Sequence, residues 1–556
     1  MPTLLVITVL LPLFGSAALL LAPKLDHKSA RVIALGTALV TLALTVLLVV
    51  NFDKTLTTPQ FAFQPKNGLY GLSWVAVPGG SGIRFAFGLD GLSLWVFALT
   101  ALLVITAIFS SWESIKEQAA AHYALILALE AGLLGLFASL DIILFYIFFE
   151  FSLLPLFFLI GIYGGPERRR AAITFFLYTL VGSLLTLLGM IALVVIHRQY
   201  GPGHVLTFSI PELTEGLKSL TWDEWRAAPT SWTSPQVLIF LLLFAGFAVK
   251  VPLVPFHTWL PLAHVEAPTA GSILLAGVLL KVGSYGFLRF NMSMVPQGAI
   301  YLFPLLATIA VAGIIYGALT ALAQTDVKKL VAYSSVSHLG FIALGTFAMT
   351  GTGMDGAVIQ MLNHGLNTGA LFACVGIIYE RYHTREMAEL SGLWKRLPIF
   401  AFFFILTGLA SAGVPGLNGF TGEFPILLGM FARSRLFGVL GATGMIFGAY
   451  YIFWMLQKFA FGPLHEPWGH SEHADGHGNE HPQIRPVGWH EIAGLSPIMV
   501  LIVVIGVYPK PFFDRLRPTV ATIAANYPQP EFERPRPAVV STDGTTRVSL
   551  AQDRAR

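Results

Sequence analysis

The chain has 556 residues, of which 55% are hydrophobic and 12% charged, and its mean hydropathy is +0.71. Soluble domains carry about 25% charged residues, so this composition excludes a soluble multidomain protein and indicates a polytopic membrane protein. A single cysteine, Cys374, excludes a disulfide framework and any metal or iron–sulfur site held by several thiolates, and the net charge of +4, spread over loops and a tail, does not indicate nucleic-acid binding.

Runs of about 18 or more apolar residues predict membrane-spanning helices, and the sequence contains enough of them for an all-α polytopic fold. Fourteen spans are predicted, near residues 3–22, 30–50, 91–110, 121–139, 140–162, 172–196, 236–256, 270–290, 299–320, 330–350, 355–379, 398–430, 437–461 and 492–509. The first run is too long for the core of a signal peptide and lacks a basic start, so we expect it to remain as a helix.

The distribution of basic residues predicts the orientation in the membrane. Odd-numbered connections between the spans carry 15 lysines and arginines, and even-numbered connections carry 9, six of them in two long loops. Short loops rich in Lys and Arg favour the cytoplasmic side of the membrane, and the charges of long loops have the least influence on orientation. We therefore expect the odd-numbered connections to be cytoplasmic and both termini to face the outer, periplasmic side.

Seven titratable residues interrupt the apolar runs, at a cost of about 2.5–3.5 kcal/mol for each charge at the bilayer centre on insertion scales. Acids come first, then lysines, histidines and a last acid: Glu130, Glu150, Lys250, Lys281, His338, His364 and Glu423. Any one of them alone is equally well read as part of a structural ion pair or as a satisfied histidine. Together, at about one per helix, they indicate a proton relay, because neighbouring charges shift one another's proton affinity.

Two of the predicted helices are broken by helix-disrupting residues. One reads AVKVPLVPFHTWLP, with Pro252 and Pro255, and the other reads SAGVPGLNGFTGEF, with Pro415 and Gly416. Backbone groups freed in this way are tolerated at membrane depth only inside protein or beside water. The breaks fall about five helices apart, which predicts two inverted five-helix repeats, helices four to eight and nine to thirteen, with the conduction path between them.

These features predict the organisation of the chain. We expect helices one to three with an outer loop at 1–110, the first antiporter-like repeat at 121–290, the second at 299–461, a His-rich cytoplasmic loop at 462–491, helix fourteen at 492–526 and a disordered tail at 527–556. The two long outer loops, 51–84 and 197–235, have room for short hairpins or helices. The histidines of the His-rich loop are irregularly spaced, which favours a solvated segment over a built metal site: His465, His470, His473, His477 and His481.

The stretch PFHTWLPLAHVEAPTAGSILLAGVLLKVGSYGFLRF resembles the signature of the antiporter-like membrane subunits of respiratory complex I, the NADH–quinone oxidoreductase. FGLDGLSLWVFALTALL, RRRAAITFFLYTLVGSLL, KKLVAYSSVSHLGF and GLNGFTGEFPIL extend the resemblance from about residue 87 to 460. The L and N types of these subunits carry lysine in the twelfth helix, whereas Glu423 here resembles the M type, also called chain 4. Leu262 departs from the family, because many bacterial relatives have an acidic residue there.

The resemblance implies roles for the buried residues. By position, Glu150 and Lys250 resemble the pair that controls proton uptake, and Lys281 resembles the relay lysine of the eighth helix. The separation of Glu150 from Lys250 would destabilise the protonated lysine and pass its proton towards Lys281.

The remaining titratable residues continue this relay. The resemblance implies that His338 and His364 are polar links along the membrane plane, that Glu423 is the exit-side carrier and that Glu130 is a second acid of the family. The resemblance also implies that the protein lies in the inner membrane of a bacterial cell, with L-type and N-type subunits as its neighbours. It implies that this chain binds no cofactor. NADH, FMN, iron–sulfur clusters and quinone would be bound by other subunits of the complex.

Other functions compete with this interpretation. The same relay would serve a subunit of a multi-chain cation/proton antiporter or of a membrane-bound hydrogenase. Glu423 and the ITFFLYT stretch count against the antiporter. A purely structural scaffold does not explain so many titratable residues that are costly to insert.

Overall fold

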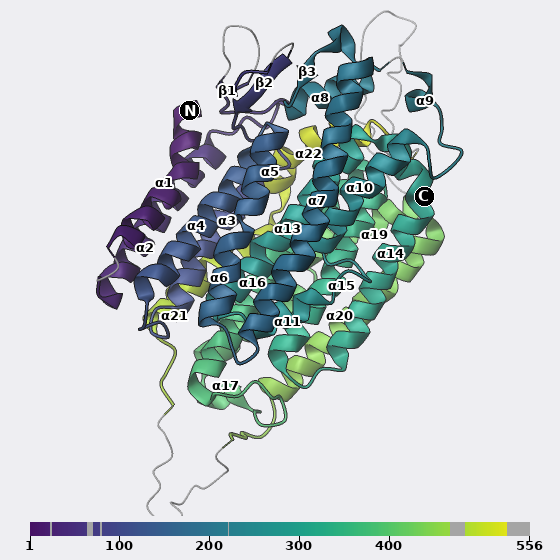
Figure 1. The fold of residues 1–556 in the computed structure, drawn as a ribbon. Helices are drawn as coiled ribbons and strands as arrows, with labels where there is room; N and C mark the ends of the chain where they lie inside the picture. The colour runs from purple at the N-terminus through teal and green to yellow at the C-terminus, as the bar shows by residue number, and fades with distance from the viewer. Residues whose placement is uncertain (23–24, 64–69, 78–79, 221, 468–483, 531–556) are drawn as a thin grey trace, which may run out of the picture.

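The computed structural model describes residues 1–22, 25–63, 70–77, 80–220, 222–467 and 484–530, and it is mainly helical (Figure 1). Long helices run side by side in one bundle, and short elements gather at its two ends. One end carries β1 (Leu72–Val75), β2 (Gly80–Phe85), β3 (Leu206–Thr207) and α8 (Ile210–Lys218), and we call it the outer end. We call the end that carries α17 (Leu393–Arg396) the cytoplasmic end, after the orientation that the loop charges predict.

The described chain contains many helices that are long and apolar enough to cross a membrane. There are 11 such spans: α1 (Pro2–Leu21), α2 (His27–Val50), α4 (Ala119–Ala138), α5 with α6 (Ile142–Tyr163), α7 (Arg168–Tyr200), α12 to η3 (Thr269–Met292), α14 (Pro296–Leu322), α15 (Val327–Phe347), α16 (Gly351–Tyr382), α20 (Arg435–Phe459) and α21 (Trp489–Val507). Shorter apolar helices are α3 (Leu94–Ser110), α10 (Pro235–Lys250) and α18 (Pro398–Ser411). The predicted all-α polytopic membrane fold is confirmed, and the total of fourteen spans stays a prediction.

Both predicted helix breaks are present. Helix α10 ends at Lys250, and the chain turns before α11 (Trp259–Glu266) begins. Helix α18 ends at Ser411, and α19 (Asn418–Arg433) follows after a turn with Gly413 at φ 72° and Gly416 at φ 90°. Positive φ angles favour glycine, and proline cannot donate the backbone hydrogen bond of a continuing helix. The inverted relation of the two repeats stays a prediction.

Two further irregularities were not predicted. The fifth span changes at Ser152 from α5 (Ile142–Phe151) to α6 (Leu153–Tyr163). The eighth span alternates between α and π geometry: α12 (Thr269–Leu274), π-helix η2 (Leu275–Leu279), α13 (Leu280–Gly286) and π-helix η3 (Phe287–Met292). Short π segments inside α-helices are frequent at functional sites, and here they flank the turn that carries Lys281.

Short elements cover the outer end of the bundle. The loops predicted to hold hairpins or helices contain the antiparallel pair β1 (Leu72–Val75) and β2 (Gly80–Phe85), then a 3-10 turn (Pro202–His204), β3 (Leu206–Thr207), α8 (Ile210–Lys218) and α9 (Asp223–Arg226). Strand β3 pairs in parallel with β2, so the two long outer loops join in one small sheet.

The prediction of one helix over 492–526 is wrong. Helix α21 ends at Val507, and a separate helix α22 (Lys510–Ala524) lies at the outer end (Figure 1). The residue before a proline is pushed out of helical geometry, and Tyr508, which precedes Pro509, has φ −132° and ψ 69°. The predicted disordered tail lies outside the described residues from 531 onwards, but Tyr527 is buried.

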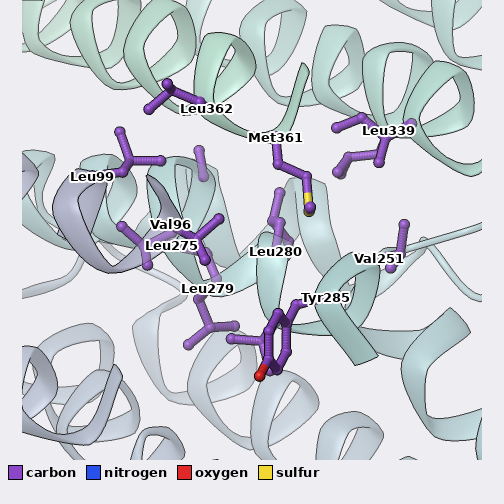
Figure 2. Packing of buried hydrophobic residues seen from close by; sticks show 14 of the residues in the cluster. Val96, Leu99, Val251, Leu275, Leu279, Leu280, Tyr285, Leu339, Met361 and Leu362 are labelled. Atoms are coloured by element: carbon purple, nitrogen blue, oxygen red, sulfur yellow. The ribbon is translucent and has the colours of Figure 1, made fainter. Parts of the chain in front are cut away.

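The centre of the bundle is formed by the most buried spans, α12 to η3, α15 and α16, with α3 packed against them. Figure 2 shows Leu99 of α3, Leu279 of the eighth span, Leu339 of α15 and Met361 of α16 in one apolar cluster. The four side chains are 0–1% exposed. The titratable residues of these helices are therefore held in an apolar, close-packed interior.

A buried ion pair fastens α16 to α21 near the cytoplasmic end. Arg381 donates from Nη1 and Nη2 to the two carboxylate oxygens of Glu491, each at 2.8 Å, and the side chains are 7% and 5% exposed. We expect Arg381→Met to destabilise the protein by about 3–5 kcal/mol, because it leaves Glu491 buried and unpaired. The exposed pair of Lys218 with Glu215 supplies the control, Lys218→Met, expected to cost about 0–1 kcal/mol. Thermal stability in detergent measures both; equal stability of the two variants would contradict the prediction.

Candidate functional site

Four of the seven predicted residues lie in one series in the interior, as two hydrogen-bonded pairs whose histidine rings neighbour each other. The Nζ atom of Lys281 lies 2.8 Å from Nδ1 of His364, and the His364 and His338 ring centroids are 5.7 Å apart. Nδ1 of His338 donates to Oε1 of Glu423 at 2.9 Å. All four side chains are buried, and they come from four helices: α13, α16, α15 and α19. The series therefore crosses the bundle from the eighth span to the second broken helix.

A crossing of two glycines lets Lys281 reach His364. Gly277 in the eighth span and Gly365 in α16 face each other so closely that a Cβ on Gly365 would lie 2.6 Å from the Gly277 carbonyl oxygen. Any larger residue at Gly365 would force the two helices apart. Lys281 also donates to the carbonyl oxygen of Ala276, which lies in the π segment next to this crossing.

Glu423 closes the other end of the series in a network of hydrogen bonds. Its Oε1 accepts from His338 and, at 3.1 Å, from Nε2 of Gln360. The Tyr451 hydroxyl oxygen lies 3.2 Å from Nε2 of His338, in hydrogen-bond contact, so both ring nitrogens are engaged. The neighbouring residue, Gly422, has no room for a side chain, because Gln360 Oε1 occupies that space.

Gln360 and Tyr451 were not among the predicted site residues. Gln360 precedes His364 by four residues in α16, and this spacing places both side chains on one helix face. That signal was present in the sequence. Tyr451 lies in α20, in an ordinary aromatic stretch, and nothing in its local sequence marks it.

A small cavity of about 10 Å³, roughly the space of one water molecule, lies beside the two histidines. Its lining includes His338, His364, Gln360, Asn367 and Ser411, all of them polar. The Nε2 atom of His364 has no hydrogen-bond partner among the described residues. A buried polar atom beside a polar cavity is suited to hydrogen bonding with water, and such a bridge would shorten the step between the rings.

Lys250 and Glu150 lie near each other without forming an ion pair among the described residues. The Nζ atom of Lys250 lies 4.6 Å from the ring centroid of Phe149, and it has no hydrogen-bond partner there. Oε1 of Glu150 is buried and has no hydrogen-bond partner among the described residues. The aromatic face of Phe149 stabilises a cation at Lys250, and such a contact is stronger in a desolvated site. The joint role of Glu150 and Lys250 in proton uptake, which the resemblance implies, stays a prediction.

Glu130 stands apart from the series. Its side chain, in α4, is 0% exposed, and neither carboxylate oxygen has a hydrogen-bond partner among the described residues. A charged carboxylate in such a place is very costly, so this group is expected to be held neutral or to be reached by water. The structure does not join it to the other six residues.

The described residues contain no group of three or more His, Cys, Asp or Glu side chains that could hold a metal ion. The structure describes His465 of the His-rich loop, and its backbone forms an isolated antiparallel β-bridge with Ser391. The other predicted histidines of that loop lie outside the described residues: His470, His473, His477 and His481.

Comparisons with known proteins agree with this geometry. The sequence profile of the family described as NADH:quinone oxidoreductase/Mrp antiporter, TM matches residues 139–456, more than half of the chain. The chain belongs to this family. It is 39% identical to NADH-quinone oxidoreductase subunit M of Rhodobacter capsulatus, over 95% of this chain and 97% of the relative. It is 38% identical to NADH-ubiquinone oxidoreductase chain 4 of Chondrus crispus, over 92% of this chain and 96% of the relative.

Two solved structures have a similar fold. A chain of respiratory complex I from Thermus thermophilus with bound NADH matches with a TM-score of 0.78 and 32% identity, over 94% of this chain and 99% of that chain. A chain of the Mrp complex from Dietzia sp. DQ12-45-1b matches with a TM-score of 0.74 and 24% identity, over 94% and 52%, which is a likeness of fold alone. The resemblance inferred from the sequence motifs is confirmed.

Proposed function

We propose that this chain is a proton-translocating membrane subunit of a NADH–quinone oxidoreductase, of the M type. The observation that carries the proposal is the buried series from Lys281 through His364 and His338 to Glu423. Each member can gain or lose a proton, and intramembrane titratable groups that contact one another are typical of proton paths. The full-length similarity to subunit M and chain 4 relatives supports the same assignment.

The proton would move in two stages. In the first, charge on Glu150 and the ring of Phe149 stabilise the ammonium of Lys250. Movement of Glu150 away from Lys250 removes part of that stabilisation, and the amine releases its proton towards Lys281.

In the second stage the proton passes along the buried series, in which two hydrogen-bonded steps, Lys281 to His364 and His338 to Glu423, are separated by the gap between the two rings. His364 receives it from Lys281 at Nδ1, and His338 delivers it to Glu423, whose Oε1 lies 2.9 Å from Nδ1 of His338. The gap between the two rings is the step that the neighbouring polar cavity serves. Glu423 beside the second break is then the exit-side carrier.

The energy for this movement would come from quinone reduction in other subunits. This chain has one cysteine, Cys374, which is buried, so its own residues offer no thiolate set for an iron–sulfur cluster. We propose L-type and N-type subunits as its neighbours in the membrane plane, and the inner membrane of a bacterium, with both termini on the outer side, as its location.

The proposal is tested by NADH-driven proton pumping in inverted membrane vesicles that carry Glu150→Gln. We expect pumping and NADH oxidation both to collapse while the complex still assembles, because the amide keeps the shape of Glu150 but not its charge. Glu224→Gln, an exposed acid of α9 at the outer end, is the matched control and should be unchanged. Full pumping in the Glu150 variant would refute the coupled relay. If NADH drives nothing in wild-type vesicles either, the chain serves an antiporter or hydrogenase assembly instead.

A further inference from the structure

An ion pair closes the outer end of the span that carries Lys281. Tyr285 and Arg289 follow Lys281 along this span, at intervals of about one turn. Arg289 Nη2 lies 2.7 Å from Oδ2 of Asp90 and 2.8 Å from its Oδ1, and Nε donates to the Tyr285 hydroxyl at 2.9 Å. The Arg289 and Asp90 side chains are 15% and 5% exposed. A column of three side chains therefore leads from the relay lysine outwards and ends on this pair.

Neither member of the pair is built to accept a proton. A guanidinium has only donors and keeps its charge in proteins. Both oxygens of Asp90 contact Arg289, and Oδ1 also accepts from the backbone N–H groups of Leu92 and Ser93, each at 3.1 Å. The Ser93 hydroxyl lies 3.2 Å from the same oxygen. A proton that reached Tyr285 would therefore meet a fixed positive charge and a carboxylate already paired with that charge.

Helix α22 packs against the turn that carries Asp90. The N–H of Gly91, next to Asp90, donates to Thr519 Oγ1 at 3.0 Å, and Trp95 Nε1 donates to the carbonyl oxygen of Phe512 at 3.2 Å. A Cβ on Gly91 would collide with the backbone of α22, so the helix sits directly on this turn. The cover limits the water that could otherwise carry protons around the pair.

The column differs in kind from the relay that leaves Lys281 in the other direction. Tyr285 is 1% exposed, and in Figure 2 its hydroxyl oxygen points away from Leu280 and Met361. That hydroxyl accepts from Arg289. Towards His364 the lysine contacts a ring nitrogen that can take its proton, whereas Tyr285, about one turn further out along the span, is a phenol bonded to a guanidinium.

We propose that the Asp90–Arg289 pair, covered by α22, is a proton barrier that prevents Lys281 from discharging to the outer side before the proton reaches Glu423. This inference rests on the proposed function, because it takes Lys281 to be a proton carrier. Arg289 acts here as a positioning residue: it fixes a charge and occupies a carboxylate, and no proton passes through it.

Arg289→Gln tests the barrier. The change leaves the Asp90 carboxylate buried without its cation and beside Tyr285, so it becomes an outer-side proton acceptor. We expect passive proton leak through the assembled complex to rise several-fold and protons pumped per NADH to fall. The leak is measured in inverted vesicles in which ATP hydrolysis has built a proton gradient; after inhibition of hydrolysis, the recovery rate of a pH-sensitive dye gives the leak without any use of NADH. Vesicles that lack the complex give the background.

The double variant Arg289→Gln with Asp90→Asn separates a barrier from a structural support. Asparagine can still accept from the N–H groups of Leu92 and Ser93 but takes up no proton, so the leak should return to the wild-type rate. A double variant as leaky as Arg289→Gln would show disrupted packing and overturn the proposal, as would a tight, assembled Arg289→Gln complex. If Arg289→Gln does not assemble, Arg289→Lys replaces it: lysine keeps the ion pair but can release its proton, so a wild-type leak rate there would overturn the barrier. Failure of NADH-driven pumping in wild-type vesicles would refute the proposed function and leave the leak result standing.

Discussion

Lys281→Met is expected to reduce proton pumping in NADH-energised vesicles to background. Lys281 lies where the two paths meet, because it contacts His364 of the relay and is the first residue of the column that leads to the proposed outer barrier. Removal of a positioned proton-transfer group typically slows the transfer about 10²–10⁴-fold, and this series offers no second amine at that place. NADH oxidation should fall with pumping if the two are tightly coupled. An uncoupler should not restore it, because the block lies in the path and not in the gradient.

The substitution is chosen so that loss of pumping cannot be attributed to loss of the fold. Methionine has nearly the length of lysine, and replacing a buried amine by an apolar group of similar shape is often neutral or stabilising. The amount of assembled complex on a native gel should therefore equal that of the wild type. Lys329→Met, at an exposed position of α15, is the matched control and should pump normally. Undiminished pumping in an assembled Lys281→Met complex would exclude this lysine from the path.

The membrane fold was predictable because hydropathy acts over whole helices. Both breaks were predictable for a local reason, since proline and glycine around Pro252 and Gly416 prevent a continuous helix whatever the neighbours do. The separation of α21 from α22 had a comparable signal at Pro509, which was read as part of a single helix. The π segments around Lys281 have no comparable signal, because they arise from packing between helices.

The titratable residues were identifiable, but their partners were not. A charge in an apolar run is conspicuous in the sequence, whereas Lys281 and His364 are 83 residues apart and His338 and Glu423 are 85. Which of them meet depends on how helices cross, as at Gly277 and Gly365, and one sequence does not encode that in any local pattern. For the same reason Glu130 was grouped with the relay, although the structure leaves it isolated in α4.

Glu423→Gln is expected to have the second largest effect, with pumping lost and the fold retained. The amide oxygen can still accept from His338 Nδ1 and Gln360 Nε2, so the hydrogen bonds that order this end of the series remain available. What disappears is a group that can carry the proton away. If Glu423 only anchored the second broken helix, this nearly isosteric change would leave pumping intact.

A second variant distinguishes a carrier from an anchor. Gln360→Leu removes one donor to Glu423 but no titratable group, so pumping should persist at a reduced rate, whereas an anchoring network would suffer more from this change than from Glu423→Gln. Glu423→Asp keeps the acid but withdraws it by one methylene from His338, and it should fall between the two. The expected order of pumping rates is therefore wild type, Gln360→Leu, Glu423→Asp and Glu423→Gln. A reversed order would show that Glu423 acts by packing and not as a proton carrier. The proton would then have to leave the series from His338 or from Tyr451, which contacts His338.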